Sequence, residues 1–288
     1  MKDYVVAIGG IGVDEYIKVD SWPELSDKAV CTRISTELGG MISNFACNIS
    51  TTGVKSYILH QLADDEYLDM FKNEFDRYKV DYSYCVVSNE IETTKCIVAN
   101  TNGERTILVI LGKATQFALK RKTVDLLSNA KFVFSTIPNF KNLVDDKEII
   151  KIITNNGAKI ILDVEATTFR ETDDLDFYFE HAGVLIFNEF GFEKYNQRYG
   201  RSPSELVKQG KIIVITKGAS GADVFTQNGS HSVEGHKIDV VDTTGAGDMF
   251  SSTFISELIK GTDEFKATEI ANLKAAEHTT YLGPKRRI

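Results

Sequence analysis

The stretch Asp242-Thr243-Thr244-Gly245-Ala246-Gly247-Asp248 places small residues next to a carboxylate. It follows an apolar, strand-like run and precedes a helical pattern from Met249 to Lys260. The backbone N–H groups of Gly245, Ala246 and Gly247 could face an anion at the helix start, where the helix dipole favours negative charge. Asp248 could then accept the proton of an attacking hydroxyl. This combination suits phosphoryl transfer to an alcohol, although a small-residue turn beside an Asp is also an ordinary helix start.

Two more glycine-rich segments could line a ligand. Gly39 and Gly40 precede a helical run, and paired glycines allow a ligand to approach the backbone closely. Asn44 follows them and offers both a donor and an acceptor to a sugar hydroxyl. Asp14 closes the segment Gly9-Gly10-Ile11-Gly12-Val13-Asp14 after the first predicted strand, where α/β folds place ligand residues. Each segment would serve equally well as a plain turn or helix cap.

The common nucleotide-binding loops are incomplete in this chain. Gly112-Lys113 is followed by Ala114, so the Lys-Ser/Thr ending of a P-loop is missing, and Gly210-Lys211 fails in the same way. The third glycine of a dinucleotide fingerprint is also missing, since Glu15 and Phe250 stand in its place. A dehydrogenase is therefore poorly supported, and phosphate binding must depend on the 242–248 loop.

The composition also argues against several other classes of protein. The chain has 288 residues and a net charge of −8, which argues against a nucleic-acid groove. The one basic cluster, Lys285-Arg286-Arg287, is interpreted as a solubilising end. No apolar run is long enough to cross a membrane. The four cysteines and five histidines show neither paired nor metal-ligand spacing, so we expect no disulfide framework or structural metal site and a cytoplasmic location.

Strand-like and helix-like segments alternate along most of the chain, which predicts a doubly wound, mostly parallel α/β sheet with helices on both faces. The predicted strands are Tyr4–Ile8, Ser56–Gln61, Lys131–Ser135, Lys159–Asp163, Val184–Asn188 and Lys211–Thr216. The predicted helices are Asn44–Thr52, Asp65–Tyr78, Val124–Ser128, Asp145–Asn155, Leu175–His181, Glu189–Tyr199 and Ser204–Lys208. Asn228-Gly229 predicts a tight hairpin between Ala222–Gln227 and Ser230–Glu234.

Four strand-like segments interrupt the alternation: Tyr16–Asp20, Ala29–Thr36, Lys95–Asn100 and Arg105–Leu111. Together they would make a small β-sheet outside the main sheet that serves as a lid, or else they would extend the edge of the main sheet. The lid interpretation divides the chain into a core (1–15, 38–92 and 113–288) and a lid (16–37 and 93–112). If the lid exposes an apolar face, a homodimer that pairs two lids is expected.

These motifs, in this order, resemble those of the PfkB/ribokinase family of carbohydrate kinases over essentially the whole chain. The carboxyl-side signature matches from Asp242 to Asp248 and continues through Phe250 and Ser252, and the amino-side signature fits at Gly39, Gly40, Asn44, Ala46 and Gly53. Gly103-Glu104-Arg105-Thr106 looks like the lid hairpin of the family. The length and the Tyr281-Leu282-Gly283 ending look like short-chain members such as fructoselysine 6-kinase. The resemblance implies a ribokinase-like fold.

The resemblance also implies a role for each matching residue. Asp248 resembles the catalytic base, and Gly245, Ala246 and Gly247 resemble the anion hole. The sugar site would consist of Asp14, Gly39, Gly40 and Asn44. The ATP site would include Thr216, Gly218, Gly221 and, beside the adenine, Asn272. Asp242 and Thr244 would contribute to a site for a monovalent cation such as K⁺. The implied activity is phosphorylation of a sugar or sugar derivative by ATP with Mg²⁺.

Some positions depart from the family pattern. The Asn-x-x-Glu motif, which is tied to magnesium and phosphate in the family, begins at Asn188 but has Gly191 in place of its glutamate. Glu189 or Glu193 would have to substitute for it. The Asp-x-Asn pattern becomes Asp163-Val164-Glu165. The missing glutamate leaves one alternative to a sugar kinase, a sugar-binding sensor of the same fold with weak catalysis. The motifs do not fix the substrate, so a nucleoside kinase is a second alternative.

Overall fold

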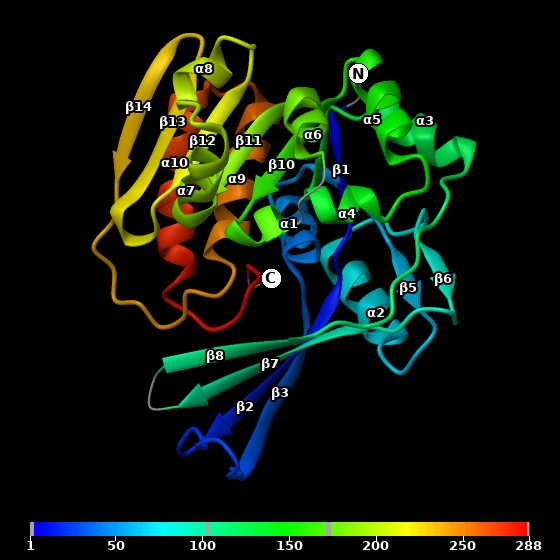
Figure 1. The fold of residues 1–288 in the computed structure, drawn as a ribbon, viewed down its shortest axis with the longest axis vertical. Coiled ribbons are helices and arrows are strands. Elements are labelled where there is room, and N and C mark those ends of the chain that lie inside the picture. Colours follow the sequence, from blue (N-terminus) through cyan, green and yellow to red (C-terminus); the bar gives the residue numbers. More distant parts are fainter. Residues whose placement is uncertain (1–2, 102–103, 171–173, 287) are drawn as a thin grey trace.

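A computed structural model describes residues 3–101, 104–170, 174–286 and 288. Its largest element is an eight-stranded sheet, in which six neighbouring strands are parallel and a hairpin of two strands at one edge is antiparallel (Figure 1). In spatial order the strands are β14 (Gly229–Glu234), β13 (Gly221–Thr226), β12 (Ile212–Thr216), β11 (Ala182–Asn188), β10 (Lys159–Val164), β9 (Phe132–Ser135), β1 (Tyr4–Ile8) and β4 (Lys55–Leu59). The predicted doubly wound, mostly parallel sheet is confirmed.

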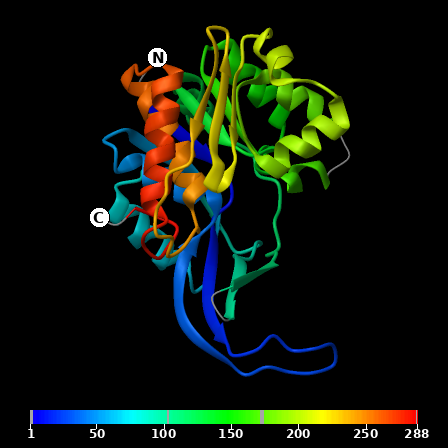
Figure 2. The same ribbon diagram turned by 90° about the vertical axis from the view of Figure 1, so that its left-hand side faces the viewer.

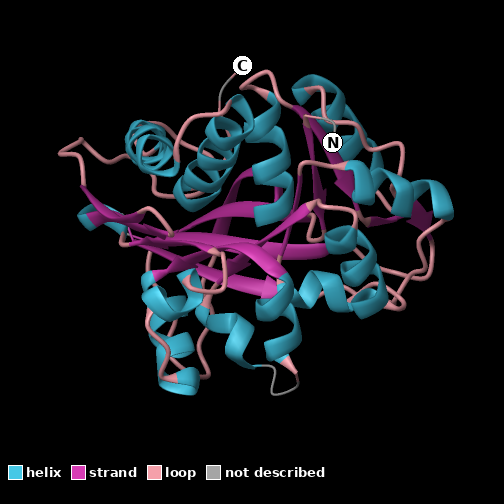
Figure 3. Ribbon diagram, turned by 90° about the horizontal axis from the view of Figure 1, so that it is seen from above, coloured by secondary structure: helices cyan, strands magenta, loops and turns pink. Residues whose placement is uncertain are grey.

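Helices cover both faces of this sheet, as Figure 3 shows. One face carries α1 (Met41–Ser50), α2 (Leu68–Tyr78), α9 (Ala246–Lys260) and α10 (Glu264–His278). The other carries α3 (Arg121–Asn129), α4 (Ile137–Lys141), α5 (Asp146–Asn155), α6 (Leu175–His181), α7 (Glu189–Tyr199) and α8 (Pro203–Val207).

Successive side chains of a strand point to opposite faces of the sheet and so contribute to two hydrophobic cores, one on each face. In β1, Val5 and Ala7 join the cluster under α1 and α9, whereas Val6 and Ile8 join the opposite cluster. Both faces are therefore apolar, as expected of parallel strands covered on both sides.

A separate four-stranded sheet projects from one end of the core (Figures 1 and 2). Its order is β3 (Cys31–Gly39), β2 (Gly12–Val19), β7 (Thr94–Thr101) and β8 (Glu104–Ile110). This confirms the small separate sheet and excludes an extension of the main sheet. The turn residues Asn102 and Gly103 lie outside the described residues. The predicted division into core and lid stays a prediction. The lid was expected to begin at residue 16 and to leave the small sheet at residue 37, but β2 begins at Gly12 and β3 runs to Gly39.

The structure differs from the predicted elements in several places. The strand predicted at 56–61 is two strands, β4 and β5 (Gln61–Ala63), separated at His60, and β5 pairs with β6 (Val86–Ser88). Helices α4 and α10 were not among the segments predicted from periodicity. Two short 3₁₀ segments, Ala166–Arg170 and Gly218–Ser220, complete the described elements. Among the described residues, no helix has both the length and the apolar character needed to cross a bilayer.

The start of α7 explains why position 191 is a glycine. The Asn188 side chain caps the helix, because its Oδ1 accepts a hydrogen bond from the Gly191 N–H at 2.7 Å. Gly191 is buried against the end of β10, where an added Cβ would lie 2.1 Å from the carbonyl oxygen of Val164. A glutamate at this position is therefore incompatible with the packing of α7 on β10.

We predict that Gly191→Ala lowers the free energy of unfolding by about 1–3 kcal/mol, since the methyl group forces α7 away from β10. Helix propensity alone predicts the opposite sign. Urea denaturation measures the difference. Gly183→Ala is the matched control, because its Cβ would meet the Lys159 side chain at an ordinary 3.5 Å. Equal stability of the two variants would contradict the packing argument.

Candidate functional site

The structure brings the two strongest sequence motifs into direct contact. Asn44, on α1, donates a hydrogen bond from Nδ2 to Oδ2 of Asp248, on the first turn of α9, at 2.8 Å. Gly40 begins α1 with a φ of 94°. Gly39 lies against Asp14 on the neighbouring strand β2, so closely that an added Cβ would come 2.3 Å from the Asp14 carboxyl carbon. Asp14, Gly39, Gly40, Asn44 and Asp248 therefore form one cluster.

Asp248 has the electrostatics of a proton acceptor. Burial raises the pKa of its carboxyl group to about 7, and the nearby Glu165 and Asp14 carboxylates act in the same direction. The Asn44 hydrogen bond and the Lys285 ammonium oppose that rise. A carboxyl group with a pKa near neutrality is suited to general-base work at neutral pH. Burial also raises the pKa of Asp14, which is opposed by a hydrogen bond with Cys96.

The loop before Asp248 is held in a tight turn. Gly245 has a φ of 75°, and an added Cβ would lie 2.3 Å from the Pro284 carbonyl oxygen. Gly247 opens on free space, since an added Cβ would meet nothing within 4 Å. The Ala246 N–H already donates to the Thr243 carbonyl at 3.3 Å. The first-turn N–H groups of α9 point out of the helix start, which is the geometry of an anion site.

The residues expected to bind ATP line one cavity of about 300 Å³. Thr216, Gly218, Gly221 and Asn272 share its wall with Ala246 and Gly247 of the 242–248 loop. Gly221 and Asn272 also hold the fold together: a Cβ on Gly221 would lie 2.0 Å from the Val233 carbonyl oxygen, and Asn272 Nδ2 donates to the Glu234 carbonyl at 2.9 Å. The cavity therefore connects the expected nucleotide residues to the start of α9.

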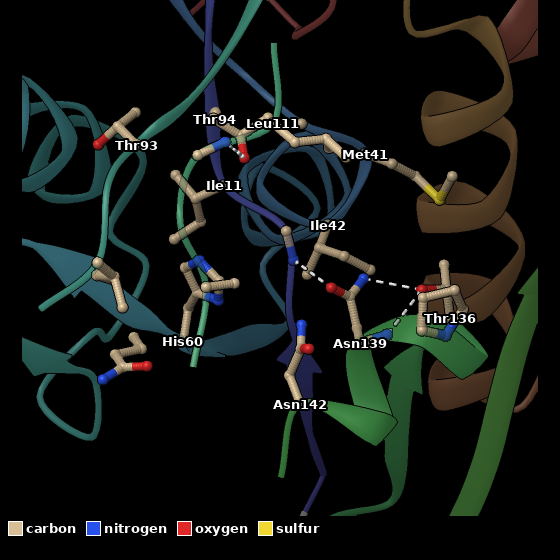
Figure 4. Close-up of a pocket in the computed structure, with 18 of the residues that line it drawn as sticks. Ile11, Met41, Ile42, His60, Thr93, Thr94, Leu111, Thr136, Asn139 and Asn142 are labelled. Atoms are coloured by element: carbon tan, nitrogen blue, oxygen red, sulfur yellow. Dashed lines mark hydrogen bonds between the residues drawn. The ribbon is translucent and has the colours of Figure 1, made fainter. Parts of the chain in front are cut away.

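A larger cavity of about 560 Å³ lies between the small sheet and the carboxyl ends of the core strands. Gly40 and Met41 line it together with Asp163 and Glu165, while Asp14, Asn44 and Asp248 are not on its wall. Figure 4 shows the side chains of Ile11, His60 and Asn142 around this space. Burial lowers the pKa of His60 to about 4, so its imidazole is neutral at pH 7. The sequence motifs did not identify His60, Asn139 or Asn142, because none of them lies in a recognisable local pattern.

Asp163 and Glu165 form a carboxylate pair at the end of β10. Burial raises the pKa of Asp163 well above its usual value, and repulsion from Glu165 and Asp248 adds to the effect. Burial also raises the pKa of Glu165. Within the described part of the chain, no group of three or more His, Cys, Asp or Glu side chains is placed to hold a metal ion. Mg²⁺ commonly binds through one or two carboxylates plus substrate phosphates, and this donor pair fits that mode. Glu189 and Glu193 are exposed on α7.

Asp242 ties the loop to the C-terminal tail. Its carboxylate accepts hydrogen bonds from the Thr244 N–H at 2.9 Å, the Thr244 hydroxyl at 2.6 Å and the Gly283 N–H at 3.0 Å. His278 Nε2 lies 3.0 Å from the Thr244 carbonyl oxygen. Asp242 and Thr244 therefore brace the loop. Their binding of a monovalent cation stays a prediction.

The interpretation of the basic tail as a solubilising end is wrong for Lys285. Its side chain is only 6% exposed, and Nζ lies 3.7 Å from Oε1 of Glu74 on α2. Nζ also donates a hydrogen bond to the Leu38 carbonyl at the end of β3. Arg286 is exposed, and Arg287 lies outside the described residues. The charge run gave no indication of which residue would be buried.

The chain is similar to characterised kinases along almost its whole length. The model of the pfkB family of carbohydrate kinases matches residues 2–286. A ribokinase from Dictyostelium discoideum is 24% identical over 97% of this chain and 96% of its own sequence.

Solved structures of the same fold include a ribokinase from Thermotoga maritima, with a TM-score of 0.82 and 17% identity over 98% of this chain and 94% of that one. A nucleoside kinase from Methanocaldococcus jannaschii also has a TM-score of 0.82, with 18% identity over 99% and 94%. The fold is therefore ribokinase-like. With a family match that extends over nearly all of its residues, the chain belongs to the pfkB family of carbohydrate kinases.

Proposed function

We propose that this protein transfers the γ-phosphoryl group of ATP to a hydroxyl group of a sugar or sugar derivative, with Asp248 as the base. The observation that carries the proposal is the partly buried Asp248 carboxyl group, bonded to Asn44 and with its pKa raised to about 7, at the start of α9. A base of this kind at a helix N-terminus suits the attack of an alcohol on a phosphate.

In the proposed step, the substrate hydroxyl loses its proton to Asp248 as its oxygen forms a bond to the γ-phosphorus. The bond from that phosphorus to the bridging oxygen breaks, and ADP leaves with the electron pair. The N–H groups at the start of α9, including that of Gly247, would stabilise charge on the phosphoryl oxygens. Closure of the small sheet over the sugar would exclude water and limit hydrolysis of ATP.

Asp163 and Glu165 are the residues that would hold Mg²⁺, which supplies charge neutralisation to the phosphates when bound. Thr216, Gly218, Gly221 and Asn272 would surround the nucleotide in the 300 Å³ cavity. A monovalent cation such as K⁺ would lie near Asp242 and Thr244. All four cysteines are free, which supports a reducing compartment such as the cytoplasm.

The acceptor would enter the 560 Å³ cavity next to Gly40. Because Asp248 is not on the wall of this cavity, the reacting hydroxyl would have to reach beyond the lining residues to Asp248. Its neutral hydrogen-bonding groups, among them His60, Asn139 and Asn142, suit a polyhydroxylated ligand or a substituted sugar. A nucleoside is the second candidate, favoured by this volume and by the structural likeness to a nucleoside kinase.

Asp248→Asn should retain the fold and sugar binding but lose about 10²–10⁴-fold in kcat, the usual contribution of a general base. The amide preserves the shape of the side chain and carries no buried charge, so stability should not fall. Coupled ADP release measures turnover, and calorimetry measures sugar binding. Near-normal turnover of this variant would contradict the base assignment.

The pH dependence follows from the raised pKa of Asp248. Below about pH 7 the carboxyl group is protonated and cannot accept the proton, so kcat/KM should fall about tenfold per pH unit on the acid side. A profile from pH 5 to 9 at saturating ATP tests this. A plateau extending down to pH 5 would show that Asp248 ionises normally or is not the base.

A substrate panel separates the remaining alternatives. ADP release is followed with ribose, fructose, fructoselysine and a set of nucleosides, each against the background ATPase rate. Turnover above that background with any acceptor rejects the sensor alternative and identifies the substrate class. Saturable binding without turnover would overturn the kinase proposal in favour of a sensor.

We also propose a homodimer through the small sheet. Strand β8 is an edge strand, and the consecutive apolar residues from Ile107 to Leu111 are 45–80% exposed. Exposed apolar edge strands favour pairing with another chain. Val109 and Leu111 also line the larger cavity, so the alternate residues Leu108 and Ile110 are the ones left for a partner.

Leu108→Glu should convert a dimer into a monomer, because it places a charge in the apolar contact. Sedimentation velocity at several protein concentrations measures the change. Leu273→Glu is the matched control, since Leu273 is 39% exposed on α10, away from the small sheet. A wild-type protein that sediments as a monomer at every concentration would contradict the dimer.

A further inference from the structure

The C-terminal tail packs between the 242–248 loop and two helices of the core. Pro284 covers Gly245, and the Gly283 N–H donates to Asp242. Asn48 on α1 accepts from the Arg286 N–H at 2.8 Å. Tyr78 on α2 donates its hydroxyl hydrogen to the Arg286 carbonyl at 2.6 Å. Backbone hydrogen bonds on both sides therefore fix the position from which the Lys285 side chain extends inward.

Lys285 is buried with its charge, which is costly unless the ammonium group has partners. It has a carbonyl acceptor, Leu38, and an opposite charge at 3.7 Å, Glu74. Leu38 immediately precedes Gly39 and Gly40, the turn that approaches Asp14 and begins α1. The ammonium group thus fastens the end of β3 to the tail and to α2 at once.

Acidic groups on several elements lie close enough to Asp14 or Asp248 to interact with their charges. Asp14 comes from β2, Glu37 from β3, Asp163 and Glu165 from the end of β10, and Asp248 from α9. The positive charge of Lys285 lowers the pKa of both Asp14 and Asp248, against the larger effect of burial. Asn44 contributes a neutral donor to Asp248. Lys285 therefore supplies positive charge to a cluster that is otherwise dominated by carboxylates.

We propose that Lys285 is a positioning residue of the phosphoryl-transfer site. Its buried ammonium group holds the Leu38–Gly40 strand end in place and supplies positive charge to the cluster that contains Asp14 and Asp248. It does not touch the reacting atoms and acts through those two carboxylates. This inference rests on the proposed function for its catalytic meaning, whereas the electrostatic part can be measured without any substrate.

The first test is a titration of the apo-protein. Carboxyl carbons of ¹³C-labelled aspartate are followed by NMR from pH 4 to 9, and Asp248→Asn assigns the Asp248 resonance. Lys285→Gln keeps a donor for Leu38 but removes the charge, so the Asp248 pKa should rise by about 0.5–1 unit. Glu74→Gln removes the counter-charge and should shift the same pKa downward. Unchanged titration in both variants would overturn the proposal.

Arg286→Gln is the matched control. It removes the same charge one residue further on, from an exposed side chain, and leaves the backbone contacts of the tail intact. The Asp248 titration should not move in this variant. A shift equal to that of Lys285→Gln would show that net charge, rather than the buried position, is responsible, and would overturn the proposal.

The second test uses turnover with whichever acceptor the panel identifies. Lys285→Gln should move the acid limb of the kcat/KM profile upward by the same 0.5–1 unit and raise KM for the acceptor, and Lys285→Arg should restore both. A loss of kcat that is equal at all pH values would indicate a purely structural role and overturn the proposal. If the wild-type protein turns over no acceptor, the proposed function fails, while the NMR titration still decides the inference about Lys285.

Discussion

The hydrogen bond between Asn44 and Asp248 is the interaction on which the site depends. It joins the first turns of α1 and α9, which are separated by 204 residues in the chain. Each helix begins at a glycine with positive φ, Gly40 or Gly245, so both helix starts can approach the same point without side chains in the way. The carboxyl group that this bond orients is partly buried, and desolvation raises its pKa to about 7. The Asn44–Asp248 contact therefore fixes the relative position of the two helix starts and also influences the pKa of the Asp248 carboxyl group.

The parts of the fold that depend on local sequence patterns could be predicted from the sequence. Short Ile- and Val-rich strands that alternate with amphipathic helices were sufficient for the doubly wound sheet. Asn228-Gly229 was sufficient to predict the β13–β14 hairpin, although the two turn residues are Gln227 and Asn228, one position earlier than expected. Helix α10 was not found by periodicity because its buried face consists of small and polar residues, Ala267, Thr268, Ala271 and Asn272, rather than large apolar ones. The division of the 56–61 segment at His60 depends on pairing between β5 and β6, which local sequence does not encode.

The site was predictable to the same extent. The glycine motifs of the candidate site were identifiable because Gly40 and Gly245 adopt positive φ, and Asp248 because it stands directly after one of these motifs. Lys285 was misinterpreted because its burial depends on Glu74 of α2 and the Leu38 carbonyl of β3, which come from distant parts of the chain. The reason for Gly191 is likewise tertiary, since it is the Val164 carbonyl oxygen that excludes a side chain there. In both cases a contact with a residue distant in sequence determines the environment of the side-chain position, which local sequence patterns do not reveal.

The small sheet and the proposed sugar site are made from the same strands. Asp14 lies near the start of β2, and Gly39 is the last residue of β3, so both stand where the projecting strands meet the core. A hydrogen-bonded pair of strands is stiff along its length, and a small rotation at its base becomes a large displacement at its tip. A rotation of β2 and β3 at Asp14 and Gly39 would therefore be largest at the far end of the sheet. If Asp14 and Gly39 bind the acceptor as proposed, the small sheet would act as a lever whose short arm is the binding site.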